Sequence, residues 1–189
     1  MRRFFKTYAF ALLMLPFLLP LTGCTDDVSG MYSTERAYFH CPAVMTTTPL
    51  YQALTNPGIY CKITFDANYY YYENTAGQSL SSPRTQLSVY GSPQYIAGFI
   101  VGTPSVPDLS GNFYQVAYDL VCPTCYDQDA IQRSLTLSTT EETATCSRCK
   151  RVYSLYNNGI ITEGDAGSHL KRYRCTYAAV SNTFTIANY

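Results

Sequence analysis

Two cysteine pairs constrain this chain more than any other feature of its sequence. They occupy residues 122–125 (CPTC) and 146–149 (CSRC), and twenty residues separate them. A C-x2-C turn directs two sulfurs the same way, and strand pairing can bring two such turns together to offer four thiolates in tetrahedral geometry. This donor set suits zinc or iron. The spacing therefore predicts a metal site formed by Cys122, Cys125, Cys146 and Cys149.

The remaining composition predicts one all-β domain with little helix. At 189 residues the chain is long enough to bury a core without disulfides. Tyr is abundant at 19 residues and Trp is absent, while Thr, Ser, Asn, Gly and Pro are frequent, which favours short strands and turns. The cysteines therefore need a reason other than general stabilisation.

The N-terminal residues are typical of a secretory signal rather than of a folded domain. Arg2, Arg3 and Lys6 precede an apolar stretch at 8–21, whose 14 residues are few for a membrane span; such a span needs about 20. The stretch ends in LTGC, with Cys24 last, and this tetrapeptide resembles the bacterial lipobox. The resemblance implies cleavage before Cys24 and acylation of that cysteine. We therefore expect a signal peptide at 1–23, a lipidated tether at 24–35 and the domain at 36–189.

A lipid anchor implies a bacterial cell-envelope protein on the periplasmic or surface face of the outer membrane, with the membrane and an unidentified envelope protein as partners. The signal holds three of the thirteen basic residues and no acidic ones, which leaves ten basic against thirteen acidic residues. This balance implies no nucleic-acid partner. In an oxidising compartment unprotected cysteines tend to pair, so a disulfide between Cys41 and Cys61 is a possibility, with Cys175 left as a buried thiol. Spacing alone does not fix this connectivity.

Hydrophobic patterning predicts a series of short strands and one short helix. Thr48 is a candidate cap and Pro49 suits the first helical position of a helix that ends before Asn56. The four tyrosines at 69–72 are interpreted as a strand with rings on both faces, rather than as a binding platform, and 73–84 as an exposed loop. The expected strands are 36–45, 59–65, 69–72, 96–101, 113–120, 133–138, 151–155, 159–162, 172–177 and 184–187.

Two other interpretations of the four cysteines compete with a metal site. The CPTC pair looks locally like a thioredoxin or glutaredoxin active site, but that chemistry needs a helix N-terminus in a βαβ frame. Here the pair follows a strand, and 126–131 predicts at most one polar turn. The other interpretation is a metal-free protein with a disulfide inside each pair. Four thiolates on a divalent ion leave a charge of −2, which Arg148, Lys150 and Arg151 are placed to offset. The same cations are equally typical of a solvated face.

The flanks of the cysteine pairs resemble a Rieske domain. The resemblance rests on FYQVAYDLVCP at 113–123, CSRCKRVY at 146–153, GDA at 164–166 and LKRY at 170–173, and it covers roughly 96–186. In that family a strand ending near Ala-x-Asp leads to the first ligand loop, an aromatic residue and a glycine turn follow the second, and a further loop covers the cluster. The resemblance implies a small β-sandwich with two metal-binding loops, here a cysteine-knuckle subdomain at about 117–170.

The ligand residues depart from the Rieske pattern. Rieske ligands run C-x-H and C-x2-H, whereas Cys125 and Cys149 stand where the histidines belong, and neither His40 nor His169 has ligand spacing. A histidine-ligated cluster is therefore not expected. Four sulfur ligands favour structural zinc, with iron or a [2Fe–2S] cluster of lower potential than a Rieske centre as the alternative.

No catalytic motif accompanies this site. The chain contains no G-x-S-x-G, no nucleotide-binding loop and no histidine-carboxylate-nucleophile set, and its two histidines have no obvious base role. We therefore expect no catalytic residues. The expected role is interaction or scaffolding around structural zinc, and the alternative is an electron carrier that uses iron at the same cysteines.

Overall fold

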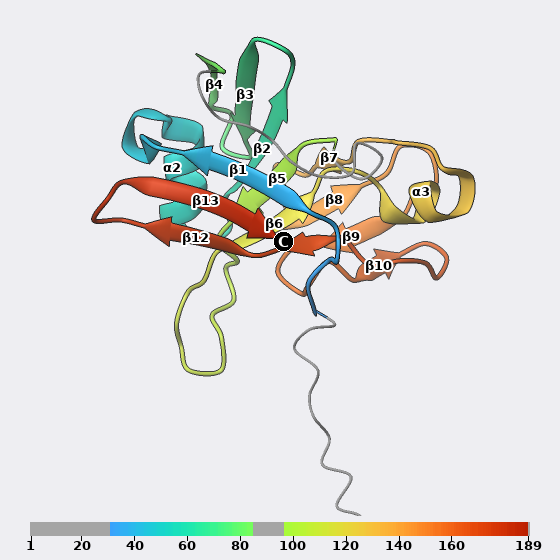
Figure 1. Ribbon diagram of the computed structural model, residues 1–189. Coiled ribbons are helices and arrows are strands. Elements are labelled where there is room, and N and C mark those ends of the chain that lie inside the picture. The colour runs from blue at the N-terminus through green and yellow to red at the C-terminus, as the bar shows by residue number, and fades with distance from the viewer. Residues whose placement is uncertain (1–30, 85–96, 189) are drawn as a thin grey trace, which may run out of the picture.

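The fold is all-β with little helix, as the sequence predicts. A computed structural model describes residues 31–84 and 97–188, in which thirteen strands form three sheets and only two short α-helices occur (Figure 1). Every strand pair in these sheets is antiparallel. The predicted signal peptide and Cys24 lie outside the described residues, so cleavage and lipidation stay predictions. Within the described ranges, no helix is long and apolar enough to cross a bilayer.

The largest sheet has six strands in the order β11-β6-β5-β2-β3-β4. Their bounds are β2 (Tyr60–Phe65), β3 (Tyr69–Asn74), β4 (Ser79–Pro83), β5 (Phe99–Gly102), β6 (Val116–Asp119) and β11 (Arg172–Tyr173). A three-stranded sheet runs β1 (Ala37–Cys41), β13 (Thr183–Asn188), β12 (Cys175–Ala178), and so joins the two ends of the described chain. The third sheet has four strands of two or three residues each, in the order β10 (Ile161–Glu163), β9 (Val152–Ser154), β8 (Thr143–Thr145), β7 (Thr136–Leu137).

The helices are short, and both α-helices have a proline in the first turn. The 3-10 helix η3 (Val44–Thr46) leads into α2 (Thr48–Thr55), and α3 (Pro123–Asp129) follows β6. Pro49 stands in the first turn of α2 as predicted, because its fixed φ suits a helix start. Thr48 is the first helical residue rather than the cap. The cap is Thr47, whose hydroxyl bonds the carbonyl of Ala43 at 3.1 Å and makes no capping bond to the helix.

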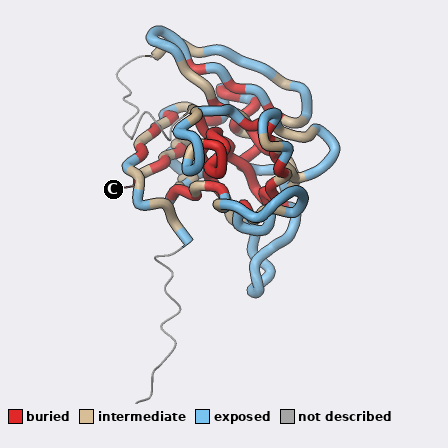
Figure 2. Tube along the Cα trace, turned by 90° about the vertical axis from the view of Figure 1, so that its right-hand side faces the viewer, coloured by how far each residue is buried: buried red, intermediate tan, exposed pale blue. Residues whose placement is uncertain are grey.

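Two apolar clusters divide the interior (Figure 2). One joins the three-stranded sheet and α2 to the large sheet through aromatic contacts, such as the edge-to-face pair Phe39–Tyr70 at 5.4 Å. The other cluster packs the large sheet against the four-stranded sheet, which is called the small sheet below, and it includes three of the four paired cysteines. The cysteine site therefore grows directly out of a hydrophobic core.

The strand predictions miss two strands, β4 beside the tyrosine run and β8 before the second cysteine pair. Residues 69–72 are a strand, with the rings of Tyr70 and Tyr72 buried and those of Tyr69 and Tyr71 exposed, as expected from alternation. The prediction of a loop at 73–84 is wrong, because β4 pairs with β3 to close a hairpin. Gly77, at φ +83°, makes the turn. The sequence of β4 has no apolar alternation, so only its pairing with β3 identifies it as a strand. Residues 85–96 lie outside the described chain.

Candidate metal centre

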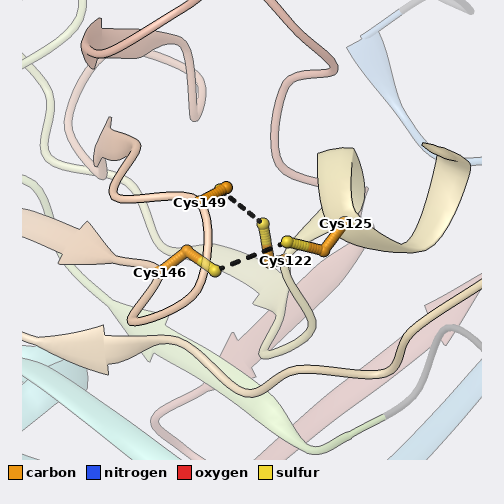
Figure 3. A group of neighbouring side chains, drawn as sticks. All are labelled: Cys122, Cys125, Cys146 and Cys149. Carbon is orange, nitrogen blue, oxygen red and sulfur yellow. Dashed lines mark hydrogen bonds between the residues drawn. The ribbon is translucent and has the colours of Figure 1, made fainter. Parts of the chain in front are cut away.

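The first cysteine pair spans the start of a helix. Cys122 ends the extended segment after β6, and its N–H donates to the carbonyl of Arg133 at 2.7 Å. Pro123 then begins α3, so Cys125 lies in the first helical turn. The sequence predicts only one polar turn after Cys125, whereas the helix starts inside the motif and ends at Ala130 with φ +54°. The helical turn directs both sulfurs toward the second pair (Figure 3).

The second cysteine pair forms the turn of the β8–β9 hairpin. The N–H of Cys146 donates to the carbonyl of Arg151 at 3.0 Å, and the N–H of Lys150 donates to the carbonyl of Cys146 at 2.9 Å. Lys150 adopts φ +62°, a left-handed conformation that reverses the chain into β9. The two bonds close the turn around Cys149. We call residues 122–125 the first knuckle and residues 146–149 the second knuckle. Hydrogen bonds within the chain fix the backbone of both knuckles.

The four sulfurs converge at distances suited to one metal ion. The Sγ atoms of Cys122, Cys125, Cys146 and Cys149 all lie within 4.8 Å of one another. Two contacts join the cysteine pairs, Cys122–Cys149 and Cys125–Cys146, both at 3.7 Å between Sγ atoms (Figure 3). A tetrahedral zinc ion with Zn–S bonds of about 2.3 Å separates its sulfurs by about 3.8 Å, whereas a disulfide needs about 2.0 Å. All four cysteines are free thiols, so the predicted cluster forms and could hold a metal.

The four thiols differ in burial and in hydrogen bonding, and the pKa values of Cys125 and Cys149 therefore shift in opposite directions. Cys122, Cys125 and Cys146 are buried, whereas Cys149 is partly exposed. Loss of solvent raises the pKa of Cys125, and the neighbouring thiols raise it further. Burial also opposes ionisation of Cys149, but hydrogen bonds from the backbone and side chain of Arg151 outweigh it and lower its pKa to about 7. Cys149, the partly exposed thiol, is therefore the one whose lowered pKa favours the thiolate.

Arg151 is the cation whose side chain hydrogen-bonds one of the four sulfurs. Its side chain is buried, bonds Cys149, and donates from Nε to the carbonyl of Asp165 at 2.8 Å and from Nη2 to that of Ala166 at 3.0 Å. The other two predicted cations have different positions. Arg148 pairs with Asp129 at 2.8 Å on the surface, and Lys150 is exposed. Only Arg151, of these three, is placed to offset the charge at short range.

A loop at 164–168 covers the two knuckles. A Cβ added to Gly164, at φ +96°, would lie 3.1 Å from Cγ of Arg151, and one added to Gly167 would lie 2.6 Å from Oγ1 of Thr124. Only glycine at these positions lets the loop approach both knuckles. The Thr124 hydroxyl also donates to the carbonyl of Ser168 at 3.4 Å. The loop therefore packs against residues of both cysteine turns.

Tyr153 is a sulfur partner that the sequence analysis did not identify. It is fully buried on β9, with its hydroxyl 3.4 Å from Sγ of Cys122 and 3.0 Å from Oγ1 of Thr124. Burial, and then the bond to Cys122, raise the pKa of this phenol, so it remains a donor. Hydrogen bonds of this kind stabilise thiolate charge. The available signal was an aromatic residue four positions after Cys149, on a strand whose alternation points it inward.

The three remaining described cysteines lie apart from this centre. Cys41 and Cys61 are buried free thiols with different partners, the hydroxyl of Thr47 and the carbonyl of Lys62, each at 3.6 Å. The disulfide considered between them is therefore not formed in the structure. Cys175 is a free, half-buried thiol, and burial raises its pKa to about 12.

The two histidines considered from the sequence do not join the cluster. His40 has its Nδ1 2.9 Å from the hydroxyl of Thr185, and neither it nor His169 is among the grouped ligands. Glu142 accepts a bond from the Tyr60 hydroxyl at 2.8 Å and thereby joins the β8–β9 hairpin to the large sheet. In comparisons with known proteins, the chain matches no protein-family model and no curated protein. The site must therefore be interpreted from its own geometry.

Proposed function

We propose that this protein is a bacterial envelope lipoprotein, anchored to the membrane at Cys24, whose domain holds one structural zinc ion through Cys122, Cys125, Cys146 and Cys149. The observation that carries the zinc site is the convergence of four sulfurs within 4.8 Å. The anchor rests on the signal-like residues and the lipobox resemblance. The domain then serves as an interaction module for another envelope protein.

The sulfur spacing supports one ion rather than a two-iron cluster. In a [2Fe–2S] cluster, bridging sulfides and two irons stand between the thiolates of different metals, which holds those thiolates well apart. Here each knuckle has a sulfur 3.7 Å from one in the other knuckle. That separation matches the edge of a single tetrahedron, which is about 3.8 Å for zinc.

The surroundings of the sulfurs support a structural role. Three of the cysteines are part of the apolar cluster that joins the small sheet to the large one, so a metal here would tie separate chain segments together. The ligands come from two loops, and Arg151 links them to a third. Because such a site does not exist in the unfolded chain, metal-binding free energy becomes folding free energy.

The same arrangement supports a Rieske-like architecture for the domain. The first knuckle follows β6, which ends at Asp119, and the second is followed by Tyr153 on β9. The loop at 164–168 lies against both. These are the positions that the sequence resemblance assigns to the two ligand loops and the covering loop.

One observation favours a second function, electron transfer through iron at the same cysteines. Cys149 is partly exposed while the other three ligands are buried, so one thiolate could exchange electrons with a docked partner. Hydrogen bonds to sulfur from Tyr153 and Arg151 would raise the potential of such an iron.

Metal analysis of the membrane-extracted full chain separates these functions. One zinc per chain without visible colour supports the structural site and removes the carrier. Stoichiometric iron with a red-brown spectrum that dithionite bleaches does the reverse. A chain with neither metal and with disulfides within residues 122–125 and 146–149 refutes both.

The anchor is tested independently of the metal. The mass of the N-terminal peptide reports acylation at Cys24, and Cys24→Ala is expected to abolish acylation and leave the metal content unchanged. An unacylated chain whose N-terminal residues remain uncleaved would refute the lipoprotein assignment.

A further inference from the structure

The loop between β5 and β6 projects from the domain and ends in apolar side chains. We propose that this segment, residues 104–114 and called the finger below, rests on the lipid surface to which the chain is anchored. The inference rests on the proposed lipid anchor and adds a second membrane contact to it. The finger extends below the sheets in Figure 1.

The tip of the finger is held in one conformation by its own hydrogen bonds. Asp108 and Asn112 are joined by an N–H to carbonyl bond of 2.9 Å, and the N–H of Gly111 donates to the carbonyl of Asp108 at 2.9 Å. One carboxylate oxygen of Asp108 also accepts from the N–H groups of Ser110 at 2.9 Å and Asn112 at 2.8 Å. The tip is therefore an ordered turn rather than an open coil.

The base of the finger is fixed to the domain. The Thr103 hydroxyl and the Gln115 amide both donate to the carbonyl of Leu54, at 3.1 and 3.2 Å. On the outgoing side the N–H of Ser105 donates to the carboxylate of Glu142 at 3.0 Å. Because base and tip are both ordered, the direction of the finger is set by the fold.

The side chains that the finger presents are apolar. Leu109 at the tip is fully exposed, and Val106 and Phe113 are each 52 % exposed. Asp108 is the only charged residue in the finger, and its carboxylate is already engaged by two backbone N–H groups. Ordered, exposed apolar side chains indicate an interaction surface.

The position of the finger indicates which surface it meets. Both views place the finger at the same end of the molecule as Met31, where the described chain begins (Figures 1 and 2). The apolar stretch at 8–21 and Cys24 precede that point in the sequence. The seven residues 24–30 span at most about 25 Å even when extended, so a lipid attached at Cys24 stays within that distance of the end of the molecule that bears the finger. A convex tip of three apolar side chains suits a bilayer interface, which can deform around it.

Two contacts would orient the domain where one tether cannot. The acyl chains hold the domain near the bilayer, and insertion of the finger limits its tilt. In Figure 1, α3, β8 and β9 lie at the level of the sheets, on the right of the view and above the tip of the finger. With only the tip in the lipid, the cysteine pairs would lie above the bilayer surface.

The absence of tryptophan from the chain makes a direct test possible. Leu109→Trp places the single tryptophan at the finger tip. Val180→Trp is the matched control, because Val180 is equally exposed in the turn between β12 and β13, away from that end of the molecule. Both full-length, acylated proteins are reconstituted in vesicles of phosphatidylethanolamine and phosphatidylglycerol, with and without brominated acyl chains.

We expect a blue-shifted emission that brominated lipid quenches for Leu109→Trp, and water-like, unquenched emission for Val180→Trp. Water-like emission from both would overturn the inference while leaving the anchor intact. A blue shift of Leu109→Trp that is present without vesicles and rises with protein concentration would also overturn it, because the finger would then meet a second copy. Acylation, measured by mass on the same samples, reports failure of the anchor separately.

Discussion

Replacing Arg151 by methionine tests whether a buried cation stabilises the four thiolates. The substitution keeps a long, flexible side chain of similar reach and removes the guanidinium. It deletes the bonds to the carbonyls of Asp165 and Ala166 and the bond to Cys149. Arg148→Met is the matched control, because Arg148 stands beside the same cysteine pair but bonds Asp129 on the surface.

The expected losses differ severalfold. A hydrogen bond from a charged donor contributes about 1.5 to 3 kcal/mol, so two bonds to the covering loop amount to about 3 to 6 kcal/mol of unfolding free energy. Loss of the bond to Cys149 weakens an outer contact of the metal ligands, which typically costs 10- to 100-fold in metal affinity. The Arg148 pair is 44 % and 47 % exposed, and such pairs contribute about 0 to 1 kcal/mol.

Urea unfolding at saturating zinc measures the stability loss, and competition with a chelating indicator measures zinc affinity. Arg151→Met should lower both, and Arg148→Met should leave both close to the unsubstituted protein. Equal losses in the two variants would refute the reasoning, since a general effect of positive charge near the site would then explain them. Unchanged zinc affinity in Arg151→Met would also refute it.

Three further outcomes are expected. Peroxide treatment of the metal-free protein should link Cys122 to Cys149 and Cys125 to Cys146, because these sulfurs are only 3.7 Å apart; peptide mapping that finds bonds within each C-x-x-C instead would contradict this geometry. Burial raises the pKa of Asp119 to about 7. The folded protein therefore keeps this proton where the unfolded chain, with a pKa of about 3.9, loses it, so stability falls as pH rises from about 4 to 7 and then levels off, by up to about 4 kcal/mol. Asp119→Asn should lack this slope, so the difference in unfolding free energy between the two proteins should vary with pH between about 4 and 7. A difference independent of pH would contradict the raised pKa. Cys146→Ser should cost several kcal/mol of stability when zinc is present, and an unchanged melting temperature would argue against a structural metal.

The sequence predicts the ligands because a metal-binding motif is local. Two residues between cysteines suffice to place both sulfurs on one turn, whatever the rest of the chain does. The sequence places Arg151 beside the second cysteine pair and an aromatic residue four positions after Cys149. Which sulfur each side chain contacts depends on how β9 packs against the first cysteine pair, and residue spacing does not encode that packing. For the same reason β4 could not be predicted: its polar residues form a strand only because they hydrogen-bond to the free edge of β3. The early start of α3 is different, since Pro123 at its first position was a usable signal.

The distribution of strand length indicates where a metal would be needed. The strands of the sheet that carries the second knuckle have only two or three residues each, whereas β2 and β3 have six. Pairings that short cannot sustain a sheet by themselves, so the small sheet depends on its contact with the large one and on the link between its knuckles. The three-stranded sheet and α2 have their own cluster, which contains none of the four paired cysteines. Loss of the metal should therefore open the small sheet first, and hydrogen exchange in Cys146→Ser should accelerate at β8 and β9 while β2 and β5 stay protected. Uniform acceleration across all four strands would mean that the domain is a single cooperative unit and that the metal stabilises it as a whole.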